Sequence, residues 1–283
     1  MGRRPTKMNE KPPNSRNRER RERVSGLFFE GAVIPKRVDV VIPVLNEVHV
    51  LERTVAEVRA YLQESFPYRW RIVIVSNGST DGTDELAAGL SARHEDVDFL
   101  ALALRGRGRS LRHAWTRSDA DAVCYFDVDL STSLVFLRPL IEAILEEGYE
   151  VATGSRLLPG SQTNRSVRRE AISRIYNRII RLVFRTSLKD AQCGFKAISR
   201  NAIGRILPRV KDESWFFDTE LLVLAENEGL SVKEIPVVWR EDPDSRVQIV
   251  PTAIDDLKGV VRVWRSLRGE ARLAARLRAG DSA

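Results

Sequence analysis

Two aspartates, Asp127 and Asp129, directly follow an apolar run from Ala122 to Phe126. If the strand continued through them, its alternation would place both carboxylates on one face. Two carboxylates that close repel each other, so a compensating charge is expected beside them. Mg²⁺ or Mn²⁺ meets this need, because hard cations use one or two carboxylates and take water and substrate phosphates as further ligands. The spacing predicts a metal site that holds a diphosphate; an Asp-rich turn that caps the next helix is the structural alternative.

Two glycine-rich segments offer further contacts to phosphate. NGSTDGTDEL (77–86) is a turn that opens a helix, and its backbone amides can face a nucleotide. A plain helix cap by Ser79 or Thr83 is the alternative. RGRGRSL (105–111) brings two arginines that can reach phosphate. It does not form the pattern G-x-G-x-x-G, so a dinucleotide-binding fold is disfavoured.

The elements that must position these residues alternate between strand and helix. Expected strands, almost continuously apolar, cover 38–45, 71–76, 98–104, 122–128 and 149–155, and expected helices cover 46–63, 83–94, 110–118 and 134–147. This order predicts an α/β fold with a mostly parallel sheet and helices on both faces. Ligands of such sheets bind at the carboxyl ends of the strands. We therefore expect the polar stretches after the first four strands to converge on one edge.

The second half of the chain is less regular. It contains a strongly basic helix (168–185) and two strands (191–199 and 231–239) around a helix at 217–228. Near the C-terminus, the helix expected over 252–268 has apolar residues at positions 254, 257, 261, 264 and 267, with Lys258, Arg262, Arg265 and Arg268 between them. This pattern is typical of a basic amphipathic helix at a membrane surface.

The positive charge of the chain is concentrated in one segment. Residues 1–24 contain nine Lys or Arg and three Glu, and so carry +6 of the formal net charge of +7. The remainder is nearly neutral, which argues against a nucleic-acid partner. We expect a basic disordered tail over 1–30, a globular domain over 37–250 and a basic amphipathic helix over 251–283.

The cysteine content and hydropathy point to a cytoplasmic protein. Only Cys124 and Cys193 occur, which predicts no disulfide framework, and Cys124 lies in an apolar run typical of a core. No apolar run is long enough to cross a bilayer. We therefore expect a protein peripheral to the inner face of the cell membrane.

Seven blocks occur in an order that resembles family 2 glycosyltransferases: VVIPVLNE, SNGSTDGT, RGRGRSLRHA, DVDLSTSL, GSR, DAQCGFKA and FFDTELLVLAE. The pattern is most similar to the polyprenyl-phosphate (dolichyl-phosphate) hexosyltransferases, especially the glucosyl branch, over residues 37–265. The resemblance implies a GT-A nucleotide-diphospho-sugar fold, a Mg²⁺ or Mn²⁺ cofactor and inversion to a β-linked lipid-phosphate sugar. It also implies UDP-glucose or GDP-mannose as the donor and polyprenyl phosphate as the acceptor.

The resemblance assigns expected roles to individual residues. Residues of the two nucleotide-binding loops are Pro43, Asn46, Glu47, Ser76, Asn77 and Asp81. Asp127 and Asp129 match the metal motif, and Arg107 lies in the block after the third strand, where it is expected to contact substrate. Residues expected to hold the acceptor phosphate are Arg156 and Arg169. Further substrate-binding positions are Gln192 and Arg246, the latter where the family often has Lys.

One departure from the family concerns the base of the nucleotide. The second loop usually carries Asp where this chain has Ser76, followed here by Asn77. Because that Asp commonly contacts the base, the resemblance leaves the base open, together with the choice between glucose and mannose.

Polyprenyl phosphate can react without a strong base. A phosphomonoester has a second pKa of about 6, so it is largely dianionic at neutral pH and its oxygen can attack C1 of the sugar directly. Two other readings remain. A glycan, protein or small alcohol acceptor would need a general base, for which Asp218 or Glu220 is the catalytic candidate. An inactive transferase-like adaptor would use the basic tail to bind nucleic acid or membrane.

Overall fold

The computed structural model describes residues 35–240 and 249–280, and within the last helix the side chains of 252–273. These residues belong to one compact unit, Lys36–Ala283. The tail expected over 1–30 and the proposed substrate-binding residue Arg246 lie outside the described residues.

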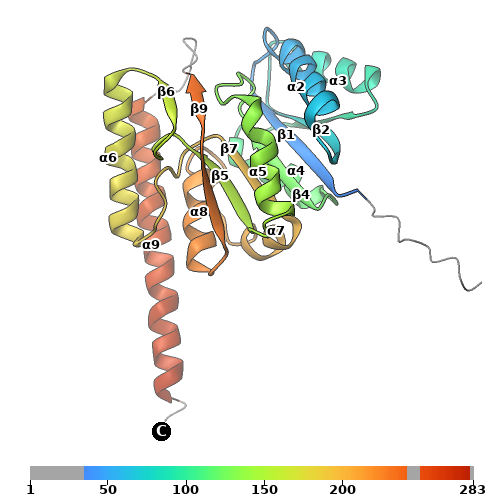
Figure 1. Ribbon diagram of the computed structural model, residues 1–283. Coiled ribbons are helices and arrows are strands. Elements are labelled where there is room, and N and C mark those ends of the chain that lie inside the picture. The colour runs from blue at the N-terminus through green and yellow to red at the C-terminus, as the bar shows by residue number, and fades with distance from the viewer. Residues whose placement is uncertain (1–34, 241–248, 281–283) are drawn as a thin grey trace, which may run out of the picture. The chain divides into compact units, whose positions relative to one another are not determined.

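A seven-stranded sheet with the order β3-β2-β1-β4-β7-β5-β8 forms the centre of this unit. All neighbouring strands are parallel except that β7 runs antiparallel to β4 and β5 (Figure 1). The strands are β1 (Arg37–Val44), β2 (Arg69–Asn77), β3 (Val97–Leu102), β4 (Ala122–Phe126), β5 (Val151–Ser155), β7 (Phe195–Ser199) and β8 (Val232–Pro236). β6 (Gln162–Asn164) and β9 (Val238–Arg240) pair in a separate ribbon.

Helices cover both faces of the sheet, as the sequence predicts. One face packs on α2 (Leu51–Ser65), α3 (Thr83–Arg93) and α5 (Leu137–Leu145), which follows the short 3-10 turn η1 (Leu134–Phe136). The other face packs on α4 (Arg107–Arg117), α6 (Val167–Phe184), α7 (Arg200–Ile206), α8 (Phe217–Asn227) and α9 (Ile249–Gly280).

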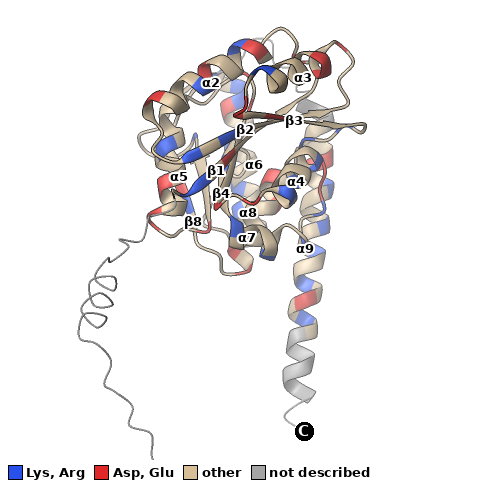
Figure 2. Ribbon diagram, turned by 90° about the vertical axis from the view of Figure 1, so that its right-hand side faces the viewer, with Lys and Arg blue, Asp and Glu red and all other residues tan. Residues whose placement is uncertain are grey.

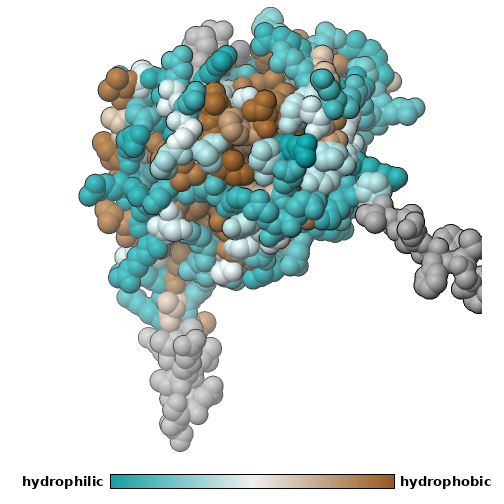
Figure 3. All heavy atoms as spheres, viewed as in Figure 1, coloured by the Kyte–Doolittle hydropathy of each residue, from teal (hydrophilic) through white to brown (hydrophobic). Residues whose placement is uncertain are grey.

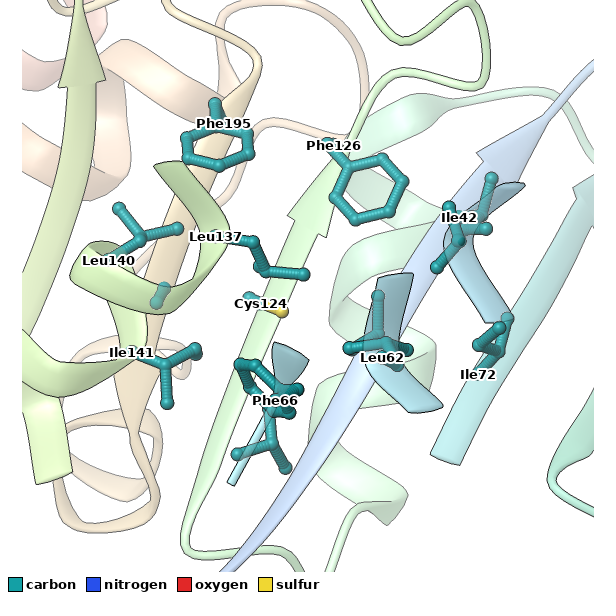
Figure 4. Close-up of a cluster of buried hydrophobic side chains, with 14 of the residues drawn as sticks. Ile42, Leu62, Phe66, Ile72, Cys124, Phe126, Leu137, Leu140, Ile141 and Phe195 are labelled. Atoms are coloured by element: carbon teal, nitrogen blue, oxygen red, sulfur yellow. The ribbon is translucent and has the colours of Figure 1, made fainter. Parts of the chain in front are cut away.

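Strand alternation divides the buried side chains between two cores. In β4, Cys124 and Phe126 point to the first core, whereas Val123 and Tyr125 point to the second. Figure 4 shows part of the first core, where Cys124 and Phe126 lie among side chains from β1, α2 and α5. Both faces of β4 are buried, which explains why its sequence is continuously apolar.

Several boundaries differ from those expected. The helix expected from residue 46 begins at Leu51, because Asn46 has a positive φ of 58° that ends the strand in a loop. The strand expected over 191–199 begins only at Phe195, and the strand expected over 231–239 is divided into β8 and β9. β4 ends at Phe126, two residues before the predicted end.

The C-terminal helix α9 (Ile249–Gly280) continues past the amphipathic stretch expected over 252–268, and it has one buried side and one exposed apolar stripe. Its buried positions are Asp256, Gly259, Val260 and Val263. The predicted stripe points partly outward, since Ile254, Leu257 and Val261 are each about half exposed. Cationic side chains also line the helix (Figure 2). Within the described part of the chain, no helix has both the length and the apolar composition needed to span a bilayer.

Candidate active site

The loops after β1 and β2 are joined by side chains that the sequence singles out. The Asn46 amide oxygen accepts a hydrogen bond from the Thr80 backbone N–H at 2.8 Å, and the Asn46 N–H donates to Ser79 Oγ at 3.1 Å. Ser76 is fully buried and its hydroxyl donates to Ser79 Oγ at 2.8 Å. Ser76 therefore orders this turn rather than presenting a group to solvent. The half-buried Pro43 precedes this loop near the end of β1.

Asp81 joins the same two loops through its carboxylate. One oxygen accepts from the Val48 N–H at 3.3 Å and the other from the Thr83 N–H at 3.1 Å, while the Glu47 N–H donates to Thr83 Oγ1 at 2.8 Å. Asp81 thus holds the first turn of α3 against the loop after β1.

Asn77 extends this network to the third loop. Its side-chain amide donates to the Val44 carbonyl at 2.8 Å and accepts from the Gly106 N–H at 3.2 Å. The side chain is almost fully buried, and these two bonds fix the backbone of the neighbouring loops. The loops after β1, β2 and β3 therefore meet at one edge of the sheet, as expected.

The glycine-rich loop before α4 is not an open phosphate cradle. The Gly108 N–H donates to the Ser214 carbonyl at 3.2 Å and the Arg109 N–H to the Glu213 carbonyl at 3.1 Å. A side chain at Gly108 would overlap Phe217. The absence of side chains at these glycines thus allows residues 212–217 to pack against this segment. The Arg109 side chain adds an ion pair with Glu213.

Asp127 and Asp129 lie in a turn and not in the strand itself. The Leu130 N–H donates to the Asp127 carbonyl at 3.0 Å, and Asp129 Oδ1 accepts from the Ser131 N–H at 2.9 Å. The expectation that strand alternation places both carboxylates on one face is therefore wrong, because the turn decides how they lie. Asp129 caps its own turn, but it remains close enough to raise the pKa of Asp127.

Arg107 supplies the compensating charge that the two aspartates require. Its Nη2 lies 2.8 Å from Asp127 Oδ1 and 3.9 Å from Asp218 Oδ2. Burial nevertheless raises the pKa of Asp127 to about 6, although Arg107 opposes this shift. A side chain at Gly194 would overlap the ends of both the Asp127 and the Arg107 side chains and displace them from this contact.

Asp218 is the centre of a buried network beneath this pair. Lys196 Nζ lies 3.0 Å from Asp218 Oδ1, and the Tyr125 hydroxyl donates to the same oxygen. Lys196 is fully buried, which is costly for a cation unless it is paired. Sequence reasoning missed Lys196, although a lysine inside the apolar strand FKAIS was a usable signal.

Glu220 and Gln192 both connect the domain to α9. Glu220 accepts two hydrogen bonds from Arg262, at 2.6 and 3.0 Å, and Gln192 Nε2 donates to Asp256 Oδ2 at 2.9 Å. Burial and the nearby charge of Asp212 raise the pKa of Asp256 to about 7. The two residues expected in catalysis and substrate binding thus contact α9 through their side chains.

Basic side chains gather beyond β5. Arg156 donates to both oxygens of the fully buried Asp190, at 2.7 and 2.9 Å. Burial and the positive charge of Arg156 lower the pKa of Arg165, whose side chain is almost fully buried and pairs with Glu170. Arg169 lies in the first turn of α6, where its N–H donates to the cap Ser166 at 3.4 Å. Asp190 and Arg165 were not predicted, although Asp190 opens the block DAQCGFKA.

The residues present fit a cation that takes most of its ligands from elsewhere. Among the described residues, no three acidic, His or Cys side chains are grouped as a metal site. Two carboxylates at the end of β4 match Mg²⁺ or Mn²⁺, which complete their shell with water and phosphates. These two carboxylates are therefore the candidate metal ligands.

Comparison with known proteins supplies an independent line of evidence. Residues 39–207 match the family model described as Glycosyl transferase family 2. Glycosyltransferase AglD of Haloferax volcanii is 35% identical over 242 residues, which cover 85% of this chain and 39% of AglD. Dolichyl-phosphate beta-glucosyltransferase of Saccharomyces cerevisiae is 29% identical over 238 residues, which cover 77% of this chain and 70% of the yeast protein. The chain thus corresponds to only part of each relative.

Solved structures show the same fold. Glucosyl-3-phosphoglycerate synthase from Mycobacterium tuberculosis, in complex with Mn²⁺, UDP-glucose and phosphoglyceric acid, superposes with a TM-score of 0.60 at 17% identity, covering 82% of this chain and 79% of the synthase. Its complex with Mg²⁺ and UDP gives a TM-score of 0.59 at 18% identity and the same coverages. The expected GT-A type of fold is therefore confirmed.

Proposed function

Because the chain belongs to glycosyl transferase family 2, we propose that it is a metal-dependent inverting transferase that moves a hexose from a nucleotide-sugar to polyprenyl phosphate. The order of side chains along the sheet edge carries this proposal. In this proposal the loops after β1 and β2 bind the nucleotide, Asp127 after β4 binds the diphosphate through the cation, and the arginines beyond β5 bind the acceptor. The strand order supports it, because β4 lies between β1 and β5. The similarity to the dolichyl-phosphate beta-glucosyltransferase of Saccharomyces cerevisiae favours glucose over mannose as the sugar.

Asp127 and Asp129 would hold Mg²⁺ or Mn²⁺ together with the diphosphate of the donor. When bound, the cation neutralises the charge that develops on the leaving nucleoside diphosphate. Arg107 contributes positive charge beside Asp127, since its Nη2 lies 2.8 Å from Asp127 Oδ1. In the reaction, an acceptor phosphate oxygen forms a bond to C1 of the sugar, and the bond from C1 to the diphosphate breaks with its electron pair leaving on the nucleoside diphosphate.

Asp218 and Glu220 both interact with other side chains of the protein, which favours a phosphate acceptor over an alcohol. Asp218 is held by Lys196 and Tyr125, and Glu220 is held by Arg262. Both carboxylates are buried and their oxygens are occupied by these partners, so neither is placed to take a proton from an alcohol. A phosphate dianion needs no such base, whereas a glycan, protein or small alcohol would.

The cluster beyond β5 carries more positive charge than its acidic partners neutralise. Among the described residues, three arginines (Arg156, Arg165 and Arg174) share two acidic partners, Asp190 and Glu170, because Glu170 pairs with both Arg165 and Arg174. Arg169 stands in the first turn of an 18-residue helix, where backbone amides and the helix dipole favour anions. An acceptor phosphate would balance this excess of charge.

We expect Arg169→Gln to raise the KM for polyprenyl phosphate about tenfold, because one charge-assisted hydrogen bond is lost. Transfer of labelled glucose from UDP-glucose, with and without polyprenyl phosphate, measures this and tests the proposed function itself. Arg205→Gln, which removes an exposed arginine of α7 that pairs with Glu150 before the start of β5, should leave the KM unchanged. Equal loss of donor and acceptor affinity in Arg169→Gln would refute the acceptor role.

We further propose that α6 and α9 hold the enzyme at an anionic membrane on the cytoplasmic side. The exposed apolar side chains of α6 are Val167, Ile172, Ile175, Ile179 and Leu182. Exposed arginines stand among them, at positions 168, 174 and 178. Ile254, Leu257 and Val261 form a similar exposed stripe on α9. Figure 3 shows apolar surface on the side where α6 lies.

Binding to anionic vesicles should be salt-sensitive, because each Lys or Arg near the surface contributes about 1 kcal/mol. Ile175→Glu with Leu182→Glu should weaken vesicle sedimentation, as should Trp264→Glu or deletion of residues 1–24, which carry +6. Leu104→Glu, at an exposed site in the loop after β3, serves as the control. Equal binding to neutral and anionic vesicles, or none to either, would exclude the electrostatic contact.

A further inference from the structure

Trp215 is a large aromatic side chain left exposed between buried neighbours. Its indole is 45% exposed, whereas Phe216 and Phe217 immediately after it are buried in the core beneath α4. A single exposed apolar residue is common on protein surfaces and needs no function. The position of Trp215 relative to the candidate active site is what distinguishes it.

The indole lies directly over the arginine that pairs with Asp127. The Arg107 guanidinium carbon is 5.0 Å from the centroid of the Trp215 ring and 5.0 Å from that of the Tyr125 ring. The same guanidinium contacts Asp127 through Nη2 at 2.8 Å. Tyr125 is fully buried, so Trp215 is the ring on the open side of Arg107.

The backbone that carries Trp215 is firmly held. The carbonyls of Glu213 and Ser214 accept hydrogen bonds from the N–H groups of Arg109 and Gly108 in the first turn of α4. The Ser214 N–H in turn donates to Asp212 Oδ1 at 2.8 Å. The exposed indole is therefore preorganised, so a ligand that contacts it need not order this segment.

The strand order indicates which part of a ligand would meet this ring. Nucleotide loops follow β1 and β2, the arginines for the acceptor lie beyond β5, and Asp127 follows β4, which lies between β1 and β5 in the sheet. Arg107 connects Trp215 to Asp127. The sugar is bonded to the diphosphate and is attacked by the acceptor phosphate. It must therefore lie between the diphosphate site at Asp127 and the acceptor site beyond β5.

We propose that Trp215 is a specificity-determining residue whose exposed indole packs against the hexose ring of the donor. This inference rests on the proposed function and adds to it the surface that recognises the sugar. Aromatic side chains suit this role because they offer a rigid apolar surface beside polar groups.

The affinities of UDP-glucose and UDP, measured by calorimetry in the presence of Mn²⁺, separate the sugar contact from other roles. In Trp215→Ala, we expect UDP-glucose to bind about five- to tenfold more weakly and UDP to bind as in the wild type. Trp215→Phe should restore most of the loss, because it keeps an aromatic surface. Trp70→Ala serves as the control. It removes a partly exposed indole at the start of β2, the end away from the nucleotide loop, and should leave the ratio of the UDP-glucose and UDP affinities unchanged.

Each alternative gives a different result. Equal weakening of UDP and UDP-glucose would mean that Trp215 acts on the nucleotide or on the fold, and would overturn the inference. An effect confined to the KM for the lipid acceptor, or no effect, would also overturn it. If the wild type bound neither UDP nor UDP-glucose, the proposed donor would be wrong, and this outcome is distinct from a failure of the Trp215 contact.

Discussion

Asp127→Asn is expected to reduce transfer about a thousandfold while leaving the protein folded. The substitution keeps the shape of the side chain but removes the charge that would bind the cation and that pairs with Arg107 at 2.8 Å. Arg107 retains Asp218 as a second acidic neighbour at 3.9 Å, so the fold should tolerate the change. Asp129→Asn should have a similar effect on transfer, although its carboxylate also caps the turn at Ser131.

Transfer from UDP-glucose, together with thermal unfolding, measures both parts of this expectation. Asp119→Asn is the matched control, because Asp119 is an exposed aspartate at the opposite end of β4. Removal of metal with EDTA should abolish transfer, and Mn²⁺ should restore it. Full activity in excess EDTA would exclude the metal at Asp127 and Asp129.

Asp190→Ala is expected to destabilise the protein by about 3–5 kcal/mol, because it leaves the Arg156 guanidinium buried without its carboxylate. Asp190 is fully buried and Arg156 is only 12% exposed at the side chain. Asp96→Ala breaks a similar two-bond pair with Arg59, at 2.8 and 3.0 Å, but both side chains there are partly exposed. That control should cost about 1 kcal/mol or less.

The pH dependence of the stability lost in Asp190→Ala provides a second check. Burial raises the pKa of Asp190, but Arg156 outweighs burial and holds it at about 2. Because an unfolded Asp has a pKa of about 3.9, the stabilisation is fully present above that pH and is lost as the pH falls toward 2. Urea unfolding should show that the gap between wild type and Asp190→Ala narrows below about pH 4. A gap that is constant with pH would mean that the pair is not responsible.

The sequence alone determined that strands and helices alternate along the chain. It also indicated that the candidate site lies at the carboxyl ends of the parallel strands. Continuously apolar strands such as 38–45 can only be buried on both faces, and polar loops after parallel strands must meet at their carboxyl ends. These are local properties of residue type and spacing, so they can be read without knowing which segments touch. For the same reason the sequence singled out Asp127, Asn46 and Arg156, each of which follows a strand.

Only the tertiary structure decided which side chains are partners. Arg107 pairs with Asp127 and stacks between Tyr125 and Trp215, which are residues 18 to 108 positions away along the chain. The sequence placed Arg107 in a substrate-binding block but did not show these partners. The glycines beside it serve the crossing of residues 212–217 rather than a phosphate. The antiparallel β7 brings Lys196 to Asp218, and α9 brings Arg262 to Glu220. Buried charged side chains pair with the groups that lie near them in the folded protein. The spacing of residues along the sequence does not show which groups those are.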